Sequence, residues 1–308
     1  MNDTLTTPLV SVVIPTYNHA NYLGRAIKSV RDQSYANWEV IVIDNHSTDN
    51  TDEIIANIAD PRIVYFKIHN NGIIAASRNA GMRAAKGDWI AFLDSDDFWY
   101  QEKLSVVINT IRGDNSIDVC STDELQVNLT TGSKTVLSYG PNSSRFYQTL
   151  LLDGNRLSPS STVIKREFLK MHDLWFRENQ KFVTAEDYDF WMLIAQAGAK
   201  FKFIRSIQGE YLIHASNASG QSHLHQQNIV NVLEDHVYHQ QTFQPEKDKL
   251  WRQVNARLLM STAIGMLVKL DWISGMTFLV RAFLSSSTGA TAYFFSKLAK
   301  MLKTKIAT

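Results

Sequence analysis

Short hydrophobic runs alternate with amphipathic segments over the first hundred residues. Mostly apolar runs at 9–14, 38–43, 63–66 and 90–93 predict four buried strands. Between these runs, apolar residues recur at helical spacing over 22–30, 54–58 and 74–85. Because strand and helix alternate through short loops, we expect an α/β fold with a mostly parallel sheet flanked by helices.

The pattern changes twice further along the chain. Beyond residue 99 we expect helices at 104–111, at 146–152 and from 186, strands at 119–122, 160–164, 200–207 and 210–213, and a hairpin within 124–139. From residue 222 the apolar spacing is helical only, at 258–268, 278–284 and 293–306. These changes predict a domain over 1–221, divided near residue 100, and a C-terminal helical region over 222–308.

The overall composition excludes several classes of protein. Hydrophobic residues make up 44% and charged residues 20% of the chain, and the net charge is +1, so nothing indicates nucleic-acid binding. Cys120 is the single cysteine, which excludes intrachain disulfides and thiolate metal clusters. The first eight residues lack the features of a secretory signal, and no apolar run is long enough to span a bilayer, so we expect a cytoplasmic protein.

Three carboxylates follow the fourth predicted strand. Asp94, Asp96 and Asp97 lie within four residues, where a strand end gives them little room to separate. A divalent cation with oxygen ligands would relieve their repulsion, and open α/β sheets bind ligands at the carboxyl ends of their strands. The cluster therefore predicts a metal that holds a phosphorylated substrate. The alternative is a solvated acidic turn.

Polar side chains also follow the other strands. Asn18 comes after the first strand, and Asp44 and Asn45 come after the second. Arg78 lies in the third predicted helix among small residues, which let a helix approach a sheet closely. Its guanidinium could bind a phosphate or a carboxylate through two hydrogen bonds. Alternatively, Arg78 forms an internal salt bridge to Asp44 or to the acidic cluster.

Six segments carry a family resemblance in their order and spacing. They read VSVVIPTYN at 10–18, VIDNHSTD at 42–49, ASRNAG at 76–81, GDWIAFLDSDD at 87–97, AEDYDFW at 185–191 and YLIH at 211–214. This series resembles the inverting family 2 glycosyltransferases with the GT-A fold, and the match extends over about residues 8–220. On this resemblance, 8–100 is the nucleotide-binding half and 101–221 the acceptor half of a GT-A catalytic domain.

The resemblance implies a metal-dependent sugar transfer. The donor is a nucleotide-diphosphate sugar, and the cofactor is Mn²⁺ or Mg²⁺, with Asp94, Asp96 and His214 as ligands, although a structural role stays open for His214. The implied donor-binding residues are Pro15, Tyr17, Asn18, Asp44, Asn45, Arg78, Asp94, Ser95 and Asp96.

The resemblance also implies residues on the acceptor side. Asp187 matches the family's general base, which takes the proton of the acceptor hydroxyl as that hydroxyl attacks in one inverting displacement. The alternative for Asp187 is a helix-start acid with no catalytic part. Glu186, Asp97 and Trp191 are candidate acceptor-binding residues, and core packing is the alternative for Trp191.

Asn45 departs from the family pattern, because many members carry a second acid there. An Asn side chain offers both a donor and an acceptor, so the base read at this position is open: uracil is expected, with thymine and guanine as alternatives. Two other functions compete. A nucleotidyltransferase would carry a glycine-rich basic loop after the first strand, where PTYN at 15–18 has neither glycine nor lysine. A non-catalytic nucleotide-sugar binding protein would have no need of all the matched acids.

The acceptor is expected to be a saccharide or a lipid-linked saccharide in cell-surface polysaccharide synthesis. No Asp or Glu follows Asp271, and the predicted helix at 293–306 carries an apolar stripe opposite lysines. That pattern predicts a peripheral helix at the inner face of a membrane, where lysines meet anionic headgroups. The alternative is that the stripe packs on the catalytic domain or on a second subunit of a homo-oligomer.

Overall fold

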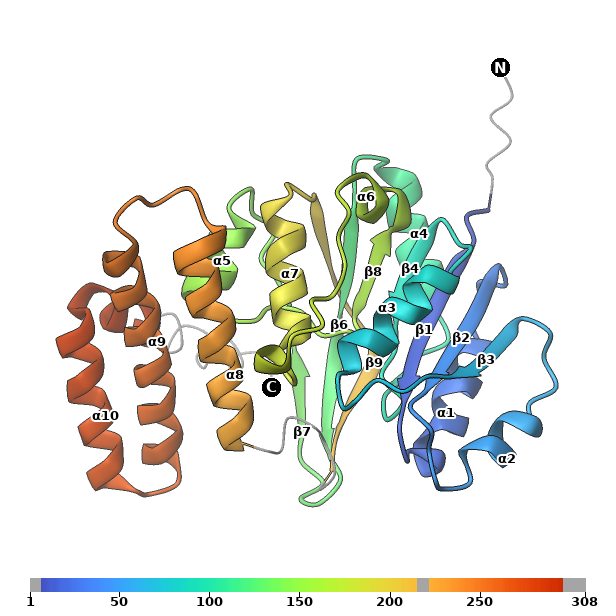
Figure 1. Cartoon of the computed structure of the whole chain (residues 1–308), viewed down its shortest axis with the longest axis horizontal. Coiled ribbons are helices and arrows are strands. Elements are labelled where there is room, and N and C mark those ends of the chain that lie inside the picture. Colours follow the sequence, from blue (N-terminus) through green and yellow to red (C-terminus); the bar gives the residue numbers. More distant parts are fainter. Residues whose placement is uncertain (1–6, 215–221, 296–308) are drawn as a thin grey trace. The chain divides into compact units, whose positions relative to one another are not determined.

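The computed structural model describes residues 7–214 and 222–295 (Figure 1). The chain divides into two compact units. Met1–Phe146 and Arg156–Ile229 form the first, which we call the sheet unit. Tyr147–Asn155 and Val230–Thr308 form the second, which we call the helical unit. The functional domain boundary at 221/222 stays a prediction.

Within the described residues, nine strands form one sheet in the order β3-β2-β1-β4-β8-β6-β9-β5, with β7 paired to β6. The parallel strands β1 to β4 are Val10–Thr16, Trp38–Asp44, Ile63–Lys67 and Trp89–Phe92. Strands β5 to β9 are Phe98–Trp99, Val119–Asn128, Lys134–Leu137, Thr162–Lys165 and Phe201–Ile213. β8 runs antiparallel between β4 and β6, whereas β9 is parallel to β6. The predicted α/β class is therefore confirmed.

Two strands differ from their predicted bounds. β1 extends through Pro15 to Thr16, where the sequence predicts a loop. Proline lacks an N–H, but β4 already ends level with Val13, so Pro15 interrupts no ladder on that side. β9 is one strand over 201–213, where the sequence predicts two strands separated at 208–209. The strand stays continuous because its pairing with β6 shifts register near Asp123.

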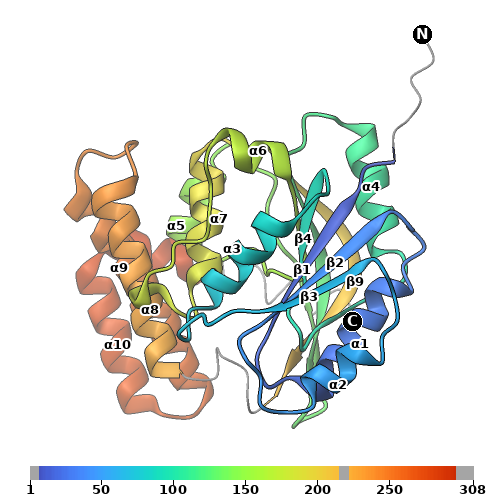
Figure 2. The same cartoon turned by 45° about the vertical axis from the view of Figure 1, so that its right-hand side comes forward.

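Helices cover both faces of this sheet (Figures 1 and 2). The helices of the sheet unit are α1 (Ala20–Arg31), α2 (Thr51–Ala56), α3 (Ile74–Ala84), α4 (Lys103–Gly113), α6 (Arg166–Met171) and α7 (Glu186–Gln196), with a 3-10 turn at Gln180–Phe182. One face is covered by α1 and α4, whose Leu23 and Leu104 share a core cluster with Val12 of β1.

The opposite face brings α3 and α7 together (Figure 2). Gly81 lets α3 approach the sheet, because a Cβ there would lie 2.7 Å from Ile43 Cδ1 and would also meet Val13. α7 packs on the same face through Phe190, whose ring lies 6.5 Å from that of Phe92 in β4. The helix that carries Arg78 thus lies beside the helix that begins with Glu186.

The helical unit contains a helical hairpin. α5 (Phe146–Asp153) enters this unit at Tyr147, α8 (Ser222–Asp235) enters it at Val230, and a π-helical turn at His236–Gln240 follows. α9 (Lys247–Val268) and α10 (Trp272–Ser285) then run antiparallel (Figure 1). These helices confirm the predicted C-terminal helical extension, whereas the predicted helix at 293–306 lies outside the described residues beyond 295. None of the described helices has the length and hydrophobicity needed to cross a membrane.

Candidate active site

Asn18 connects the loops at the carboxyl ends of β1 and β2 through hydrogen bonds. Its backbone N–H donates to Ser47 Oγ at 2.8 Å, and its Oδ1 accepts from the backbone N–H of Thr48 at 2.8 Å. Asn18 has a φ of 52°, a left-handed conformation that Asn tolerates better than most residues. Tyr17, the preceding donor-site candidate, is 53% exposed and so accessible to a ligand.

Asp44 and Asn45 are both engaged at the end of β2. Asp44 is fully buried, and it accepts hydrogen bonds from the backbone N–H of Ser47 at 2.9 Å and from the Tyr65 hydroxyl at 2.9 Å. Asn45 Oδ1 accepts from the backbone N–H of Asn70 at 2.9 Å. These contacts hold the side chains of Asp44 and Asn45 in place at the end of β2, and a pairing of Arg78 with Asp44, one alternative given for Arg78, is not among them.

The three strand-end acids have three different partners. Asp94 Oδ1 accepts from Arg78 Nη2 at 2.8 Å. Asp96 Oδ2 lies 2.9 Å from His214 Nε2. Asp97 is 1% exposed and accepts from the backbone N–H of Leu212 at 3.0 Å, and also from a serine hydroxyl. Burial and the charge of Asp96 hold the pKa of Asp97 well above its usual range. Both oxygens of Asp97 are thus committed inside the protein, which favours a structural role over acceptor binding.

Asp96 and His214 could hold a metal ion. Burial raises the pKa of Asp96, and the nearby charge of Asp94 raises it further. A cation at this place would relieve both effects. Within residues 7–214 and 222–295, no three His, Cys, Asp or Glu side chains converge as a protein-only metal site. Ions such as Mg²⁺ commonly bind one or two carboxylates plus substrate phosphates, so this donor set fits an ion shared with a diphosphate.

Arg78 joins the acidic cluster to α7. Its side chain is 3% exposed, and it forms ion pairs with Asp94 and with Glu186. The internal salt bridge to the acidic cluster, the alternative given for Arg78, is therefore present, and Glu186 is an additional partner that the sequence did not indicate. Arg78 Nε and Glu186 Oε2 are buried, with no hydrogen-bond partner among the described residues.

Asp187 lies in the first turn of α7, next to this ion pair. Burial raises the pKa of Asp187 to about 7, and the charge of Glu186 raises it as well, whereas the charge of Arg78 acts in the opposite direction. The backbone N–H of Tyr188 donates to Asp187 Oδ1 at 2.7 Å. A carboxylate with a pKa near neutrality is a much stronger base than an ordinary one and still ionises at physiological pH.

Trp191 points into the core of the sheet unit. It is fully buried, and its ring lies 6.3 Å from those of Phe92 and Phe176 and 5.6 Å from that of Phe190. This aromatic cluster favours core packing, the alternative given for Trp191. α7 therefore presents its acids at its first turn and buries its aromatic residues further along.

Three residues around the acids were not singled out in the sequence. Ser160 Oγ donates to Asp97 Oδ2 at 2.6 Å and also accepts from the backbone N–H of Asp94 at 3.1 Å. His19 Nδ1 lies 2.8 Å from the hydroxyl of Ser95, a predicted donor-site residue. Tyr22 stacks on the ring of His214 at 4.7 Å. The signal available for Ser160 was the serine-rich segment SPSS at 158–161, directly before the apolar strand β8.

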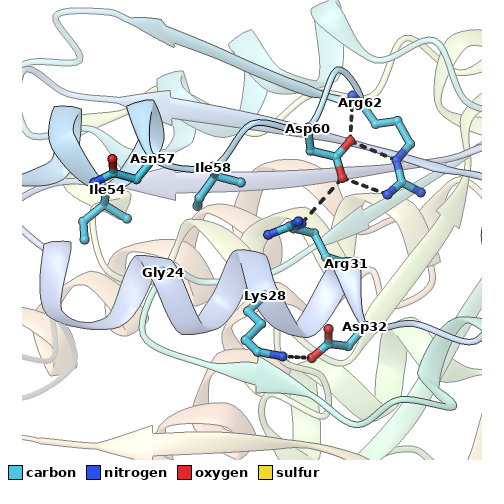
Figure 3. A pocket seen from close by; sticks show the side chains of 9 residues that line it. All are labelled: Gly24, Lys28, Arg31, Asp32, Ile54, Asn57, Ile58, Asp60 and Arg62. Carbon is cyan, nitrogen blue, oxygen red and sulfur yellow. Dashed lines mark hydrogen bonds and ion pairs between the residues drawn. The ribbon is translucent and has the colours of Figure 1, made fainter.

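A groove of about 570 Å³ lies elsewhere on the sheet unit (Figure 3). Residues of α1, of α2 and of the segment before β3 line it, and none of them is a predicted site residue. Its charged groups are already paired: Asp60 contacts Arg31 at 3.6 Å and Arg62 at 2.8 Å, and Lys28 contacts Asp32 (Figure 3). The groove therefore offers no open charge for a ligand, and the acid-lined strand ends are the better site.

Comparisons with known proteins show the family and the fold of this chain. A family model described as glycosyl transferase family 2 matches residues 11–171, which include all the strand-end acids. The chain is also similar to an Escherichia coli protein named UDP-Glc:alpha-D-GlcNAc-diphosphoundecaprenol beta-1,3-glucosyltransferase WfaP. The two are 29% identical over 235 residues, which cover 75% of this chain and 89% of the relative.

Two solved structures share the fold. The S. aureus TarS 1-349 structure in complex with UDP-GlcNAc has a TM-score of 0.66 at 22% identity, covering 88% of this chain and 80% of that one. The mannosyltransferase PcManGT from Pyrobaculum calidifontis, in complex with GDP-Man and Mn²⁺, has a TM-score of 0.62 at 19% identity, covering 96% and 81%. These likenesses confirm the predicted GT-A fold. Because the family model matches about half of the chain, this protein belongs to glycosyl transferase family 2 and is a glycosyltransferase.

Proposed function

We propose that this enzyme moves a sugar from a UDP-sugar to a hydroxyl of a saccharide or lipid-linked saccharide, with inversion and with a divalent ion, in cell-surface polysaccharide synthesis. The observation that carries the proposal is the double contact of Arg78, which joins Asp94 of the predicted donor site to Glu186, the neighbour of Asp187. The name of the E. coli relative gives a UDP-glucose donor and a diphosphoundecaprenol-linked acceptor, which supports UDP and a lipid-linked acceptor here.

The donor would lie across the carboxyl ends of β1, β2 and β4. We assign the nucleoside to residues of the first two strand ends, which are Pro15, Tyr17, Asn18, Asp44 and Asn45. We assign the diphosphate and its ion to Arg78, Asp94, Ser95 and Asp96. The guanidinium of Arg78 suits this role, because it already binds two carboxylates and could exchange one of them for phosphate oxygens.

The ion would be held by Asp96 and His214, with Asp94 bound directly or through water. When bound, the ion would supply positive charge that offsets the negative charge building up on the leaving diphosphate. The Mn²⁺ in the Pyrobaculum mannosyltransferase structure supports a divalent ion. Mn²⁺ and Mg²⁺ are both compatible with the oxygen donors present.

Asp187 is the proposed base. The acceptor oxygen forms a bond to the anomeric carbon while the bond from that carbon to the diphosphate oxygen breaks, and the electron pair of the broken bond stays on the diphosphate. The proton of the acceptor hydroxyl passes to a carboxylate oxygen of Asp187. Glu186 would remain paired with Arg78 and so keep the first turn of α7 in place.

The test is product analysis with purified protein, a panel of nucleotide sugars, and Mn²⁺ or Mg²⁺. The proposal expects release of free UDP that an acceptor accelerates and EDTA stops. Release of pyrophosphate would instead identify a nucleotidyltransferase, and no turnover with tight donor binding would identify a non-catalytic binding protein. Preference for a TDP- or GDP-sugar would correct the assigned base and leave the reaction class unchanged.

A further inference from the structure

Helix α10 is hydrophobic on two opposite sides. One side packs on α9, where Gly275 and Ala282 are buried and a Cβ on Gly275 would lie 2.7 Å from the side chain of Leu267. The opposite side carries large apolar side chains, of which Ile273 is 85% and Leu284 80% exposed. Because a helix that is hydrophobic all round is ordinarily covered all round, the outward side of α10 is expected to have a partner.

The exposed surface continues onto the turn between α9 and α10. We call it the α10 patch, and its members are Leu270, Trp272, Ile273, Met276, Val280 and Leu284. Each member is at least 50% exposed. Single exposed apolar residues are normal on a protein surface, but a continuous group along one helical hairpin marks an interaction site.

The charge of this region selects the partner. Arg281 is exposed within α10, and the exposed Lys269 and Asp271 on either side of Leu270 offset each other in charge. Over residues 272–308 the sequence contains five Lys or Arg residues and no Asp or Glu. A chain segment whose sequence is both apolar and basic matches an anionic membrane, where acyl chains receive the apolar groups and acidic headgroups attract the cations. Trp272, 62% exposed at the turn, is a side chain typical of the headgroup boundary.

A second copy of the chain fits this surface less well. In a two-fold contact the α10 patch would face itself, and two segments of the same positive charge would be brought together. α10 cannot cross a bilayer, since it has 14 residues where a spanning helix has about 20. The mode of contact that remains is a helix lying in the plane of the membrane surface.

We propose that the α10 patch inserts into the headgroup region of an anionic membrane and holds the enzyme at that surface. This assignment places the contact on residues 270–284, whereas the sequence alone points to 293–306. It deepens the proposed function by naming a partner. It rests on that function in one respect: a lipid-linked acceptor is the reason that a place at the membrane would serve the enzyme. Vesicle binding and sugar transfer are separate measurements, so either proposal can fail without the other.

Sedimentation of the full chain with lipid vesicles tests the proposal. We expect binding to vesicles that contain phosphatidylglycerol, weaker binding to pure phosphatidylcholine, and weakening by salt. Ile273→Glu and Leu284→Glu should each lower the affinity for phosphatidylglycerol vesicles by about tenfold or more, because a charge replaces a side chain that enters the membrane. Met171→Glu is the matched control: Met171 is 72% exposed in α6 of the sheet unit, and its replacement should leave binding unchanged.

Further measurements distinguish membrane binding from the other ways in which the α10 patch could be covered. Circular dichroism and UDP release should match the wild type in all three variants, since the altered positions are exposed; Ile273→Ser and Leu284→Ser replace any variant that fails to fold. A chain that ends at Phe295 should still bind vesicles, with less dependence on salt. Loss of all binding in that chain, equal binding by the Glu variants, or a soluble dimer that these variants dissociate would each overturn the proposal.

Discussion

Asp187→Asn keeps the shape of the side chain and removes its capacity to accept a proton. If Asp187 is the base, transfer should fall by about 10² or more, which is the usual contribution of a positioned base. Donor binding should survive, because the proposed contacts to the diphosphate come from other residues. The structure adds a second expectation, which concerns how the wild-type rate depends on pH.

Only the ionised form of Asp187 can take a proton, so the rate should rise with pH through the pKa of this group. Burial and the charge of Glu186 raise that pKa from 3.8 to about 7. A group of this pKa is about one-tenth ionised at pH 6 and about nine-tenths at pH 8. Transfer should therefore increase about tenfold across this interval and then level off, whereas an unperturbed Asp would give a flat profile there.

The assay is the initial rate of product formation between about pH 5.5 and pH 9, at saturating donor and low acceptor, for wild type and variant. UDP affinity is measured alongside by titration calorimetry. Glu186→Gln serves as a further variant, because it removes a like charge beside Asp187 and should move the rise to lower pH. If Asp187→Asn keeps the wild-type rise, or loses donor affinity and rate by the same factor, Asp187 is not the base.

Three further changes test two other residues of the site and the packing of the helix that carries Arg78. Asp96→Ala should abolish transfer with the fold intact, as judged by circular dichroism; near-normal turnover of this variant in EDTA would show that the metal assignment is wrong. Arg78→Met removes the cation that two carboxylates share, so the free energy of unfolding should fall by about 3–5 kcal/mol, and an unchanged urea midpoint would contradict a structural ion pair. Gly81→Ala should cost about 1–3 kcal/mol by crowding the sheet, whereas Gly113→Ala, where a Cβ meets nothing within 4 Å, should leave the melting temperature unchanged or higher.

The strand-end acids were accessible to sequence reasoning for a simple physical reason. Asp44 and Asp94 each follow a run of apolar residues long enough for one buried strand, and parallel strands end at a common edge of the sheet. The antiparallel β8 was not accessible in this way. Its place between β4 and β6 is set by pairing with strands that are distant in sequence. The apolar pattern of residues 162–165 is local and carries no information about those partners.

Side-chain partners over long separations were equally beyond reach. Glu186 is 108 residues from Arg78, and His214 is 118 residues from Asp96, so no local spacing connects them. The resemblance marked these residues as members of one site without indicating which of them touch. Trp191 shows a second limit of the sequence. A tryptophan at helical spacing is compatible with a core position and with a sugar-binding surface, and only the observed packing decides between them.

Arg78 makes the proton on Asp187 and an anion in the donor site interdependent. The positive charge of Arg78 lowers the pKa of Asp187. An anion that binds this guanidinium offsets part of that charge and so increases the proton affinity of Asp187. Thermodynamic linkage is reciprocal, so protonation of Asp187 must strengthen the binding of the same anion. If Asp187 is the base and Arg78 binds the diphosphate, as proposed, the affinity for a diphosphate should fall as the pH rises through the pKa of Asp187.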